Sequence, residues 1–247
     1  MGSALSNATP QNAARFSAAY DDVFARIAGR YDRLCDLFSF GIHRRWKSHM
    51  AFRMSAHSHE TVIDVASGTG DIPVRLLRRG YRTGMLWVTD ICPEMLALAE
   101  VKLRGVDDQV RIAIGNAEKL VAFADASMDA YSISFGMKIC DRPKVVAEAF
   151  RILKPGGRFY CLEAARISNR TVHAAYLAYM GWCMPLIGKL AADGDASAYE
   201  YLLRGVRDFP DQETFSLELH EAGFRSVTYR NMTFGIVALH EATKPGR

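Results

Sequence analysis

From residue 61 onward, short apolar runs alternate with segments whose apolar residues recur at helical spacing. Runs such as "TVIDVA" are apolar at nearly every position, which is typical of parallel strands covered on both faces. Repeated strand–helix units of this length predict an α/β fold, with a Rossmann-like, mostly parallel, seven-stranded sheet and helices on both faces. The predicted strands span 61–66, 85–90, 109–116, 128–135, 157–164, 226–233 and 235–243, with "KPGG" as a turn before the fifth. The predicted helices span 71–79, 93–103, 143–153, 171–191, 196–206 and 212–224.

The rest of the chain adds helices to this unit. Residues 1–12 are small and polar and predict a disordered lead, and 13–247 form a single domain. Within it, 13–58 predict a helical cap, and 165–208 a helical insertion after the fifth strand that acts as a lid. The uncharged stretch 174–188 in this insertion is shorter than the roughly 20 apolar residues of a membrane span. A plain core or a dimer interface is the alternative for its aromatic and methionine side chains.

Charge and cysteine content exclude several classes of protein. The formal net charge is +4, and no basic block interleaved with aromatic residues occurs, so we expect no nucleic-acid partner. The five cysteines form no C-x-x-C pair, which indicates a reducing compartment without disulfides or zinc. We expect a cytoplasmic protein. Peripheral contact with a membrane and a homodimer stay open.

A glycine turn, "DVASGTGD" (64–71), follows the first predicted strand. It contains G-x-G, but Pro73 stands where a dinucleotide site has its third glycine, which argues against NAD. No G-K-[ST] follows, which excludes a P-loop. Gly68 and Gly70 permit close approach or a positive φ. Asp64 and Asp71 flank the turn with charges that attract a cationic ligand.

Two further strand ends carry polar groups suited to a nucleoside. Asp90 ends the second predicted strand, where an acid binds ribose hydroxyls in nucleotide-binding sheets. Asn116 and Ala117 end the third, where they can meet an adenine edge. Groups suited to bind an ammonium, a ribose and an adenine together predict S-adenosyl-L-methionine (AdoMet) as the cofactor. The alternative is that these acids only cap helices or end strands.

With these motifs the chain resembles the ubiquinone/menaquinone biosynthesis C-methyltransferase family (UbiE-like), within the class I methyltransferases. The similarity runs from about Val23 to the C-terminus. The turn alone indicates only a methyltransferase, whereas the cap and late segments are family-specific. The motifs that carry the resemblance are "VFARIAGRYDRLCDLFSFGIHRRWK", "VIDVASGTGD", "ISFGMK", "RILKPGGRF", "YEYLLRGVRDFPDQET" and "GIVALH".

The resemblance implies roles for individual residues and a class of substrate. Cofactor-binding positions of the family correspond here to Thr69, Asp90, Asn116, Ala117 and Ser134. Tyr31 and the run Arg45-Trp46-Lys47 match a cap that closes over the cofactor. The implied substrate is a prenylated quinol precursor that is methylated on a ring carbon.

Four residues on the substrate side depart from the family pattern. Lys138 and Ile139 stand where the family usually has Arg-Asn, Ala164 ends "LEA" where "LEF" is usual, and Phe209 replaces a histidine. Lysine keeps the positive charge but lacks the planar fork of arginine. These changes favour a second hypothesis, in which the enzyme methylates a carbon, oxygen or nitrogen of another small aromatic or apolar acceptor. A third hypothesis is that the chain is a cofactor-binding protein without catalytic activity.

Carbon methylation needs an activated ring, usually formed by deprotonating an adjacent phenol. Lys138, just past the fourth strand, is the predicted catalytic residue because its charge lowers the pKa of a phenol in a dry pocket. A solvated loop lysine is the alternative. Candidate substrate contacts are Tyr199, Tyr201 and Asp211. The alternative is that the two tyrosines are ordinary core residues and that Asp211 only caps the following helix. No metal ligands are predicted.

Overall fold

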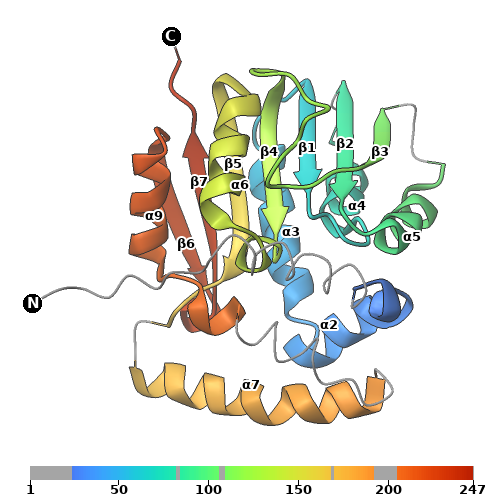
Figure 1. Cartoon of the computed structure of the whole chain (residues 1–247), viewed down its shortest axis with the longest axis vertical. Coiled ribbons are helices and arrows are strands. Elements are labelled where there is room, and N and C mark those ends of the chain that lie inside the picture. The colour runs from blue at the N-terminus through green and yellow to red at the C-terminus, as the bar shows by residue number, and fades with distance from the viewer. Residues whose placement is uncertain (1–23, 82–83, 106–108, 168–169, 192–204, 247) are drawn as a thin grey trace, which may run out of the picture.

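The computed structural model describes residues 24–81, 84–105, 109–167, 170–191 and 205–246. Seven strands form one sheet in the order β3-β2-β1-β4-β5-β7-β6 (Figure 1). Strands β1 to β5 pair in parallel, and β7 runs antiparallel to both of its neighbours. The strands are β1 (Thr61–Val65), β2 (Met85–Asp90), β3 (Val110–Ile114), β4 (Met128–Ser134), β5 (Leu153–Ala164), β6 (Arg225–Met232) and β7 (Val237–Thr243).

Each predicted strand is present, and so are the predicted helices within the described ranges. The α-helices are α2 (Tyr31–Ser39), α3 (His43–Ser55), α4 (Asp71–Arg78), α5 (Pro93–Leu103), α6 (Arg142–Ile152), α7 (Arg170–Ala191) and α9 (Gln212–Glu221). Short 3₁₀ turns are η1 (Ala28–Arg30), η2 (Met137–Ile139) and η3 (Thr233–Gly235). The predicted lead 1–12 and most of the predicted helix 196–206 lie outside the described residues.

One predicted boundary is wrong. The "KPGG" segment is part of β5, which begins at Leu153. The reason is that this segment pairs with Lys244, the residue that follows β7. Gly156 N donates to Lys244 O at 2.9 Å, and Lys244 N donates to Gly157 O at 2.9 Å. The segment therefore extends the sheet before the buried part of the strand.

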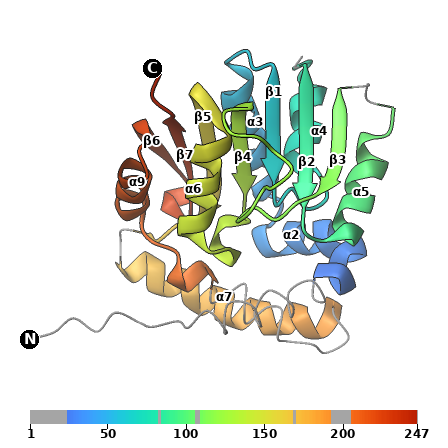
Figure 2. The same ribbon diagram turned by 45° about the horizontal axis from the view of Figure 1, so that its top comes forward.

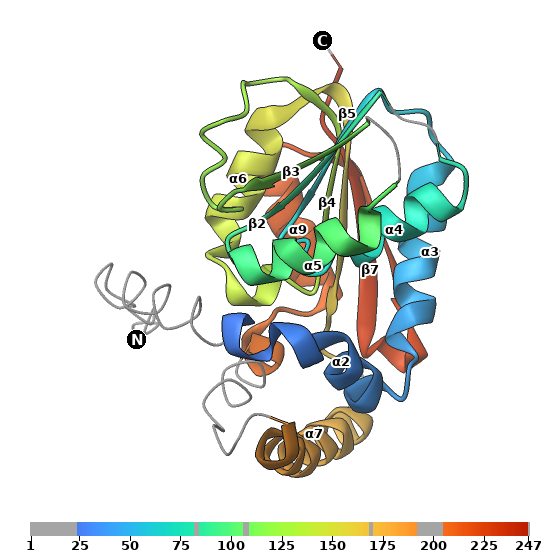
Figure 3. The ribbon, with the colours of Figure 1, turned by 90° about the vertical axis from the view of Figure 1, so that its right-hand side faces the viewer.

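Two apolar layers cover the sheet, as Figure 3 shows with α3 and α6 on opposite sides. On one face, α3, α4 and α5 pack on the sheet through buried residues such as Met50, Ile72 and Ala99. On the other face, α6 and α9 pack through residues such as Val146 and Phe215. The region predicted as a cap therefore has two parts. Its helix α3 packs against one face of the sheet, whereas α2 does not belong to either covering layer.

The other helices, α2 and α7, lie across the edge at which β1 to β5 end (Figures 1 and 2). They pack together through a small cluster formed by Ile27, Leu34 and Cys183. The rings of Phe40 and Tyr179 add a contact with centroids 6.1 Å apart. Polar groups at the strand ends thus lie beneath a helical cover. Among the described helices, none is long and apolar enough to cross a membrane.

Candidate active site

The glycine turn joins β1 to α4, and its two glycines serve different purposes. Both have positive φ, +56° at Gly68 and +78° at Gly70. A Cβ on Gly70 would lie 3.0 Å from Ala99 Cβ, so this glycine lets α4 and α5 pack closely. A Cβ on Gly68 would meet no atom within 4 Å. The space beside Gly68 is therefore open, which fits a ligand that approaches the backbone of the turn.

Asp90, the last residue of β2, connects this turn to the neighbouring strand end. Its Oδ2 accepts a hydrogen bond from Gly68 N at 2.7 Å, and its Oδ1 accepts one from Cys92 N at 2.9 Å. The carboxylate is thereby fixed at the edge where parallel α/β sheets bind nucleotides. Its role in binding ribose stays a prediction.

Asp64 lies deeper, in β1, where it is 1% exposed. Strand register places Ser132 of β4 opposite Asp64, and the Oγ atoms of Ser132 and Ser67 each donate to its carboxylate at 2.5 Å. Burial raises the pKa of Asp64 to about 6, although both serine hydrogen bonds favour the charged form. A buried negative charge therefore forms near the cofactor edge only above moderately acidic pH.

The second acid beside the turn, Asp71, is surrounded by cations. Lys47 Nζ lies 2.8 Å from Asp71 Oδ2, while the Oδ1 atom is 3.2 Å from Arg75 Nη1 and 3.5 Å from Lys102 Nζ. Burial penalises the charged form, but these cations hold the pKa of Asp71 well below its usual range. Lys47 is buried and points inward, so it does not belong to a solvated helix face with Arg44 and Arg45.

A polar bridge links the cover helix α2 to the glycine turn. Thr69 Oγ1 donates to Asp32 Oδ1 at 2.7 Å and accepts from Lys102 Nζ at 2.6 Å. Lys102 Nζ also lies 2.5 Å from Asp32 Oδ2. Tyr31 begins α2 beside this bridge, and the nearby Cys35 together with burial raises the pKa of its phenol well above the usual range. Sequence reasoning missed Asp32 and Lys102, although Asp32 directly follows the predicted Tyr31.

The remaining predicted cofactor residues lie along the same edge. Asn116 follows β3, is exposed, and accepts from Glu118 N at 2.8 Å through its Oδ1 atom. Ala117 is buried, and Ser134 is the half-buried last residue of β4. The structure thus places the predicted cofactor residues of the sheet in or just after four adjacent strands, β3, β2, β1 and β4, while Tyr31 and Lys47 lie on the helices α2 and α3. Their roles in binding remain predictions.

Lys138 follows β4 in η2, and its side chain is only 7% exposed. Its Nζ lies 3.0 Å from Glu163 Oε1, donates to Phe135 O, and sits 5.3 Å from the centroid of the Phe135 ring. The alternative of a solvated loop lysine is therefore wrong, because burial and pairing have removed Lys138 from solvent. Sequence reasoning missed Glu163, for which the available signal was one acid in an otherwise apolar strand.

The other residues that depart from the family pattern occupy different settings. Ala164 is the buried last residue of β5, and Ile139 is half-buried in η2. Phe209 is a core residue, with its ring centroid 5.4 Å from that of Phe215. The guanidinium of Arg142 lies 5.6 Å from the centroid of the Phe209 ring.

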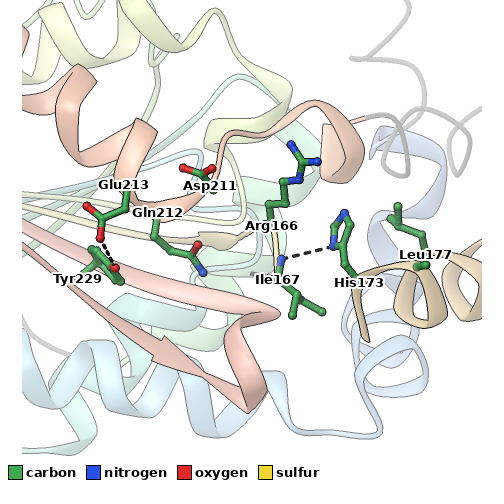
Figure 4. Close-up of a pocket in the computed structure, with 9 residues that line it drawn as sticks. Arg166, Ile167, His173, Leu177, Asp211, Gln212, Glu213 and Tyr229 are labelled. Carbon is green, nitrogen blue, oxygen red and sulfur yellow. Dashed lines mark hydrogen bonds between the residues drawn. The ribbon is translucent and has the colours of Figure 1, made fainter. Parts of the chain in front are cut away.

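A pocket of about 490 Å³ opens between the chain after β5, the start of α7 and the start of α9 (Figure 4). Asp211 lines it and also caps α9 by accepting from Thr214 N at 2.8 Å, a hydrogen bond that lowers the pKa of Asp211. The capping role is confirmed, and a substrate contact stays a prediction. Tyr199 and Tyr201 lie outside the described residues. The lining residues are Arg166, Ile167, His173, Ala174, Leu177, Asp211, Gln212, Glu213 and Tyr229.

In the part of the chain that the structure describes, no group of three or more His, Cys, Asp or Glu side chains is arranged to hold a metal ion. The seven-stranded sheet, with β7 antiparallel between β5 and β6, has the class I methyltransferase fold. Solved structures agree on the fold. A SAM-dependent methyltransferase from Thermotoga maritima matches with TM-score 0.64 and 17% identity, over 90% of this chain and 98% of that chain.

Sequence comparison gives the family within this class. The sequence model of the ubiE/COQ5 methyltransferase family matches residues 12–244. The ubiquinone/menaquinone biosynthesis C-methyltransferase UbiE of Acidiphilium cryptum is 41% identical over 225 residues, 89% of this chain and 88% of that protein. UbiE of Brucella anthropi is 39% identical over 229 residues, 91% of this chain and 86% of that protein. The chain belongs to the ubiE/COQ5 methyltransferase family and is an AdoMet-dependent methyltransferase.

Proposed function

We propose that this enzyme transfers a methyl group from AdoMet to a ring carbon of a prenylated quinol-type acceptor. The observation that carries this proposal is the buried Lys138, which lies four residues beyond Ser134 at the cofactor edge and is paired with Glu163. A fixed positive charge in a dry site stabilises a phenolate, and a phenolate makes its ring carbons nucleophilic. The relatives are named as ubiquinone/menaquinone biosynthesis C-methyltransferases, which supports the same acceptor class.

Cofactor binding in this proposal uses the strand ends. Asp90 binds the ribose hydroxyls, Asn116 and Ala117 meet the adenine, and the backbone at Gly68 admits the methionyl part. Asp64 supplies buried negative charge near the methionyl ammonium. The open space beside Gly68 supports this arrangement, since a side chain there would occupy it. Thr69, Ser134, Lys47 and Tyr31 complete the set.

When bound, AdoMet supplies an electrophilic methyl group, and in-line displacement demands mainly that donor and acceptor be held in place. The protein orients the acceptor so that its phenol oxygen meets Lys138 and its ring carbon faces the methyl group. AdoMet held at the strand ends would supply the methyl group to the ring carbon, and the phenol proton and the displaced ring proton would both pass to water. The helices α2 and α7 lie across this edge of the sheet (Figure 2).

The pocket that Asp211 lines is proposed to hold the remainder of the acceptor. It begins at Arg166, two residues after the end of β5 and three after Glu163. One wall is apolar, formed by Ile167, Ala174 and Leu177, and suits a hydrocarbon substituent. The opposite wall carries polar groups at the start of α9 and on β6.

We also propose that the face around Phe52 contacts anionic membranes, where a prenylated acceptor resides. Phe52 is 52% exposed, and the guanidinium of Arg79 lies 5.5 Å from the centroid of its ring. Arg45 borders the same shallow surface, so the charges of Arg45 and Arg79 complement anionic lipid, whereas Arg44 beside them is paired with Asp36 at 2.6 Å. Co-sedimentation with vesicles containing phosphatidylglycerol should fall for Phe52→Ala/Arg45→Ala, and equal sedimentation would contradict this contact.

A different aromatic acceptor is the second candidate, and the exchange of the usual arginine for Lys138 favours it. Methyl transfer from radiolabelled AdoMet to a panel of acceptors separates the two. The panel contains a demethylated prenyl quinol, kept reduced under anaerobic conditions, together with small phenols and heteroaromatics. We expect label in the prenyl quinol. If the radiolabelled methyl group appears only in other acceptors, the residues that depart from the family pattern accompany a change of substrate.

A further inference from the structure

Glu163 is an isolated charge in the buried part of β5, with a side chain only 1% exposed. Its carboxylate accepts three hydrogen bonds: Oε1 accepts from Lys138 Nζ at 3.0 Å and from Ala164 N at 2.8 Å, and Oε2 accepts from Lys138 N at 3.1 Å. Two of these three come from one residue. A buried carboxylate is costly unless it is paired and hydrogen-bonded. Glu163 therefore fixes both the side chain and the backbone of Lys138 through these hydrogen bonds.

Lys138 is also held from a distant part of the chain. Gly205 lies in the helical turn that returns from the insertion, and a Cβ on it would come within 3.0 Å of Lys138 O and 3.3 Å of Lys138 Cγ. The backbone of this turn thus packs directly on the stem of the lysine. Its Nζ is fixed at the other end by Glu163 and by Phe135 O.

We infer that Glu163 and Gly205 are positioning residues that hold the Lys138 side chain in place and leave one of its N–H groups for the oxygen of the acceptor. An ammonium has three donors, and among the described residues two of them go to Glu163 Oε1 and Phe135 O. Lys138 therefore acts as a hydrogen-bond donor to the acceptor oxygen. This inference rests on the proposed function.

The first test is steady-state turnover of Glu163→Gln, which keeps the shape of the side chain and removes its charge. We expect kcat to fall by roughly 10- to 100-fold, in the range that misplacement or loss of a catalytic group produces, while the AdoMet Kd stays near wild type. In a Lys138→Ala background, Glu163→Gln should have no further effect on kcat, because a positioning residue acts only through the side chain that it holds.

The second test adds one methyl group at Gly205. Gly205→Ala should lower kcat by about tenfold through displacement of Lys138 and leave the AdoMet Kd unchanged. Gly181→Ala in α7 is the matched control, since a Cβ there meets no atom within 4 Å. In a Lys138→Ala background, Gly205→Ala should have no further effect on kcat.

Three results would overturn the inference: a Glu163→Gln variant with the wild-type kcat, a Gly205→Ala variant as active as Gly181→Ala, or effects of Glu163→Gln or Gly205→Ala that add to the effect of Lys138→Ala. Each presupposes a wild-type enzyme that turns over. If wild type labels none of the acceptors in the panel, the proposed function fails, which is a different outcome from failure of the positioning roles.

Discussion

The proposed cofactor side and the proposed acceptor side of the site are built differently. On the cofactor side, backbone groups and short side chains at the ends of adjacent strands define the site, with Asp90 tied to the backbone of Gly68 and Cys92. On the acceptor side, a long side chain, Lys138, is held by Glu163 from another strand and by Gly205 from the end of the insertion. The cofactor side is thus set by the sheet itself, whereas the acceptor side depends on contacts between distant segments.

This difference indicates where substrate choice can change without loss of the cofactor. A substitution at Lys138 alters the charge or shape offered to the acceptor but leaves the glycine turn and Asp90 in place. The departures from the family pattern lie on the acceptor side or in the core beneath it, as Phe209 does. Variants on the two sides should therefore separate turnover from cofactor affinity.

The largest effect is expected for Lys138→Ala. Loss of the charge that stabilises a phenolate should lower kcat by about 100-fold or more, while the AdoMet Kd stays within about twofold of wild type. Steady-state methyl transfer and calorimetric titration measure the two quantities. Lys144→Ala is the control, because that lysine is exposed and paired on the surface with Asp141. Equal kcat in Lys138→Ala and Lys144→Ala would refute the catalytic role.

Asp90→Asn should have the opposite pattern to Lys138→Ala, with its main effect on the AdoMet Kd and not on kcat. It removes the charge at the end of β2 while it keeps one acceptor oxygen for the backbone, so ribose binding weakens and the fold persists. Loss of charge-assisted hydrogen bonds to two hydroxyls corresponds to an AdoMet Kd about 100-fold higher. Asp125→Asn, an exposed acid paired with Arg151, is the control in the same titration. An unchanged Kd would remove the ribose assignment.

A smaller, pH-dependent effect is expected for Asp64, because its pKa of about 6 lies between the pH values compared. Its folded pKa is raised, so the carboxyl is protonated at pH 5 and ionised at pH 7. A cationic ligand favours the ionised form, and the AdoMet Kd should therefore fall by about tenfold from pH 5 to pH 7. Asp64→Asn should abolish this dependence. The same pH dependence in wild type and variant would place the titrating group elsewhere.

The two glycines of the turn give the smallest expected effects and separate packing from binding. Gly70→Ala should lower the free energy of unfolding by roughly 1–2 kcal/mol, because its φ is +78° and its Cβ would press on Ala99. Gly68→Ala has the conformational cost alone but places a methyl group in the open space beside the turn. We expect chemical denaturation to show the greater loss for Gly70→Ala, and AdoMet titration the greater loss for Gly68→Ala. The reverse order would contradict these roles.

The sequence predicted the strands and the helix around the glycine turn because their signals are local. A buried strand, a glycine turn and a helix follow one another over residues 61–79, and Asp90 ends the next strand. Repeated βα units predict parallel pairing, and parallel pairing brings these strand ends to one edge of the sheet. The pairing of Asp64 with Ser132 could not be predicted, since it needs the register between β1 and β4.

The acceptor side was predicted only in part because its contacts are non-local. Lys138 was identified, but its burial depends on Glu163, 25 residues later in the chain, and on Gly205. Asp211 was identified with its capping role, whereas the pocket beside it forms only when the start of α7 meets the start of α9. The inward turn of Lys47 toward Asp71 likewise depends on the packing of α3 against α4.

The most direct test of the separation between the two sides is methyl transfer from ¹³C-methyl AdoMet to a reduced, demethylated prenyl quinol, followed by NMR of the product. Wild type should place the ¹³C-methyl group on a ring carbon, and Lys138→Ala at saturating AdoMet should form that product about 100-fold more slowly. A ¹³C-methyl group on oxygen, or equal rates for wild type and Lys138→Ala, would contradict carbon methylation assisted by Lys138.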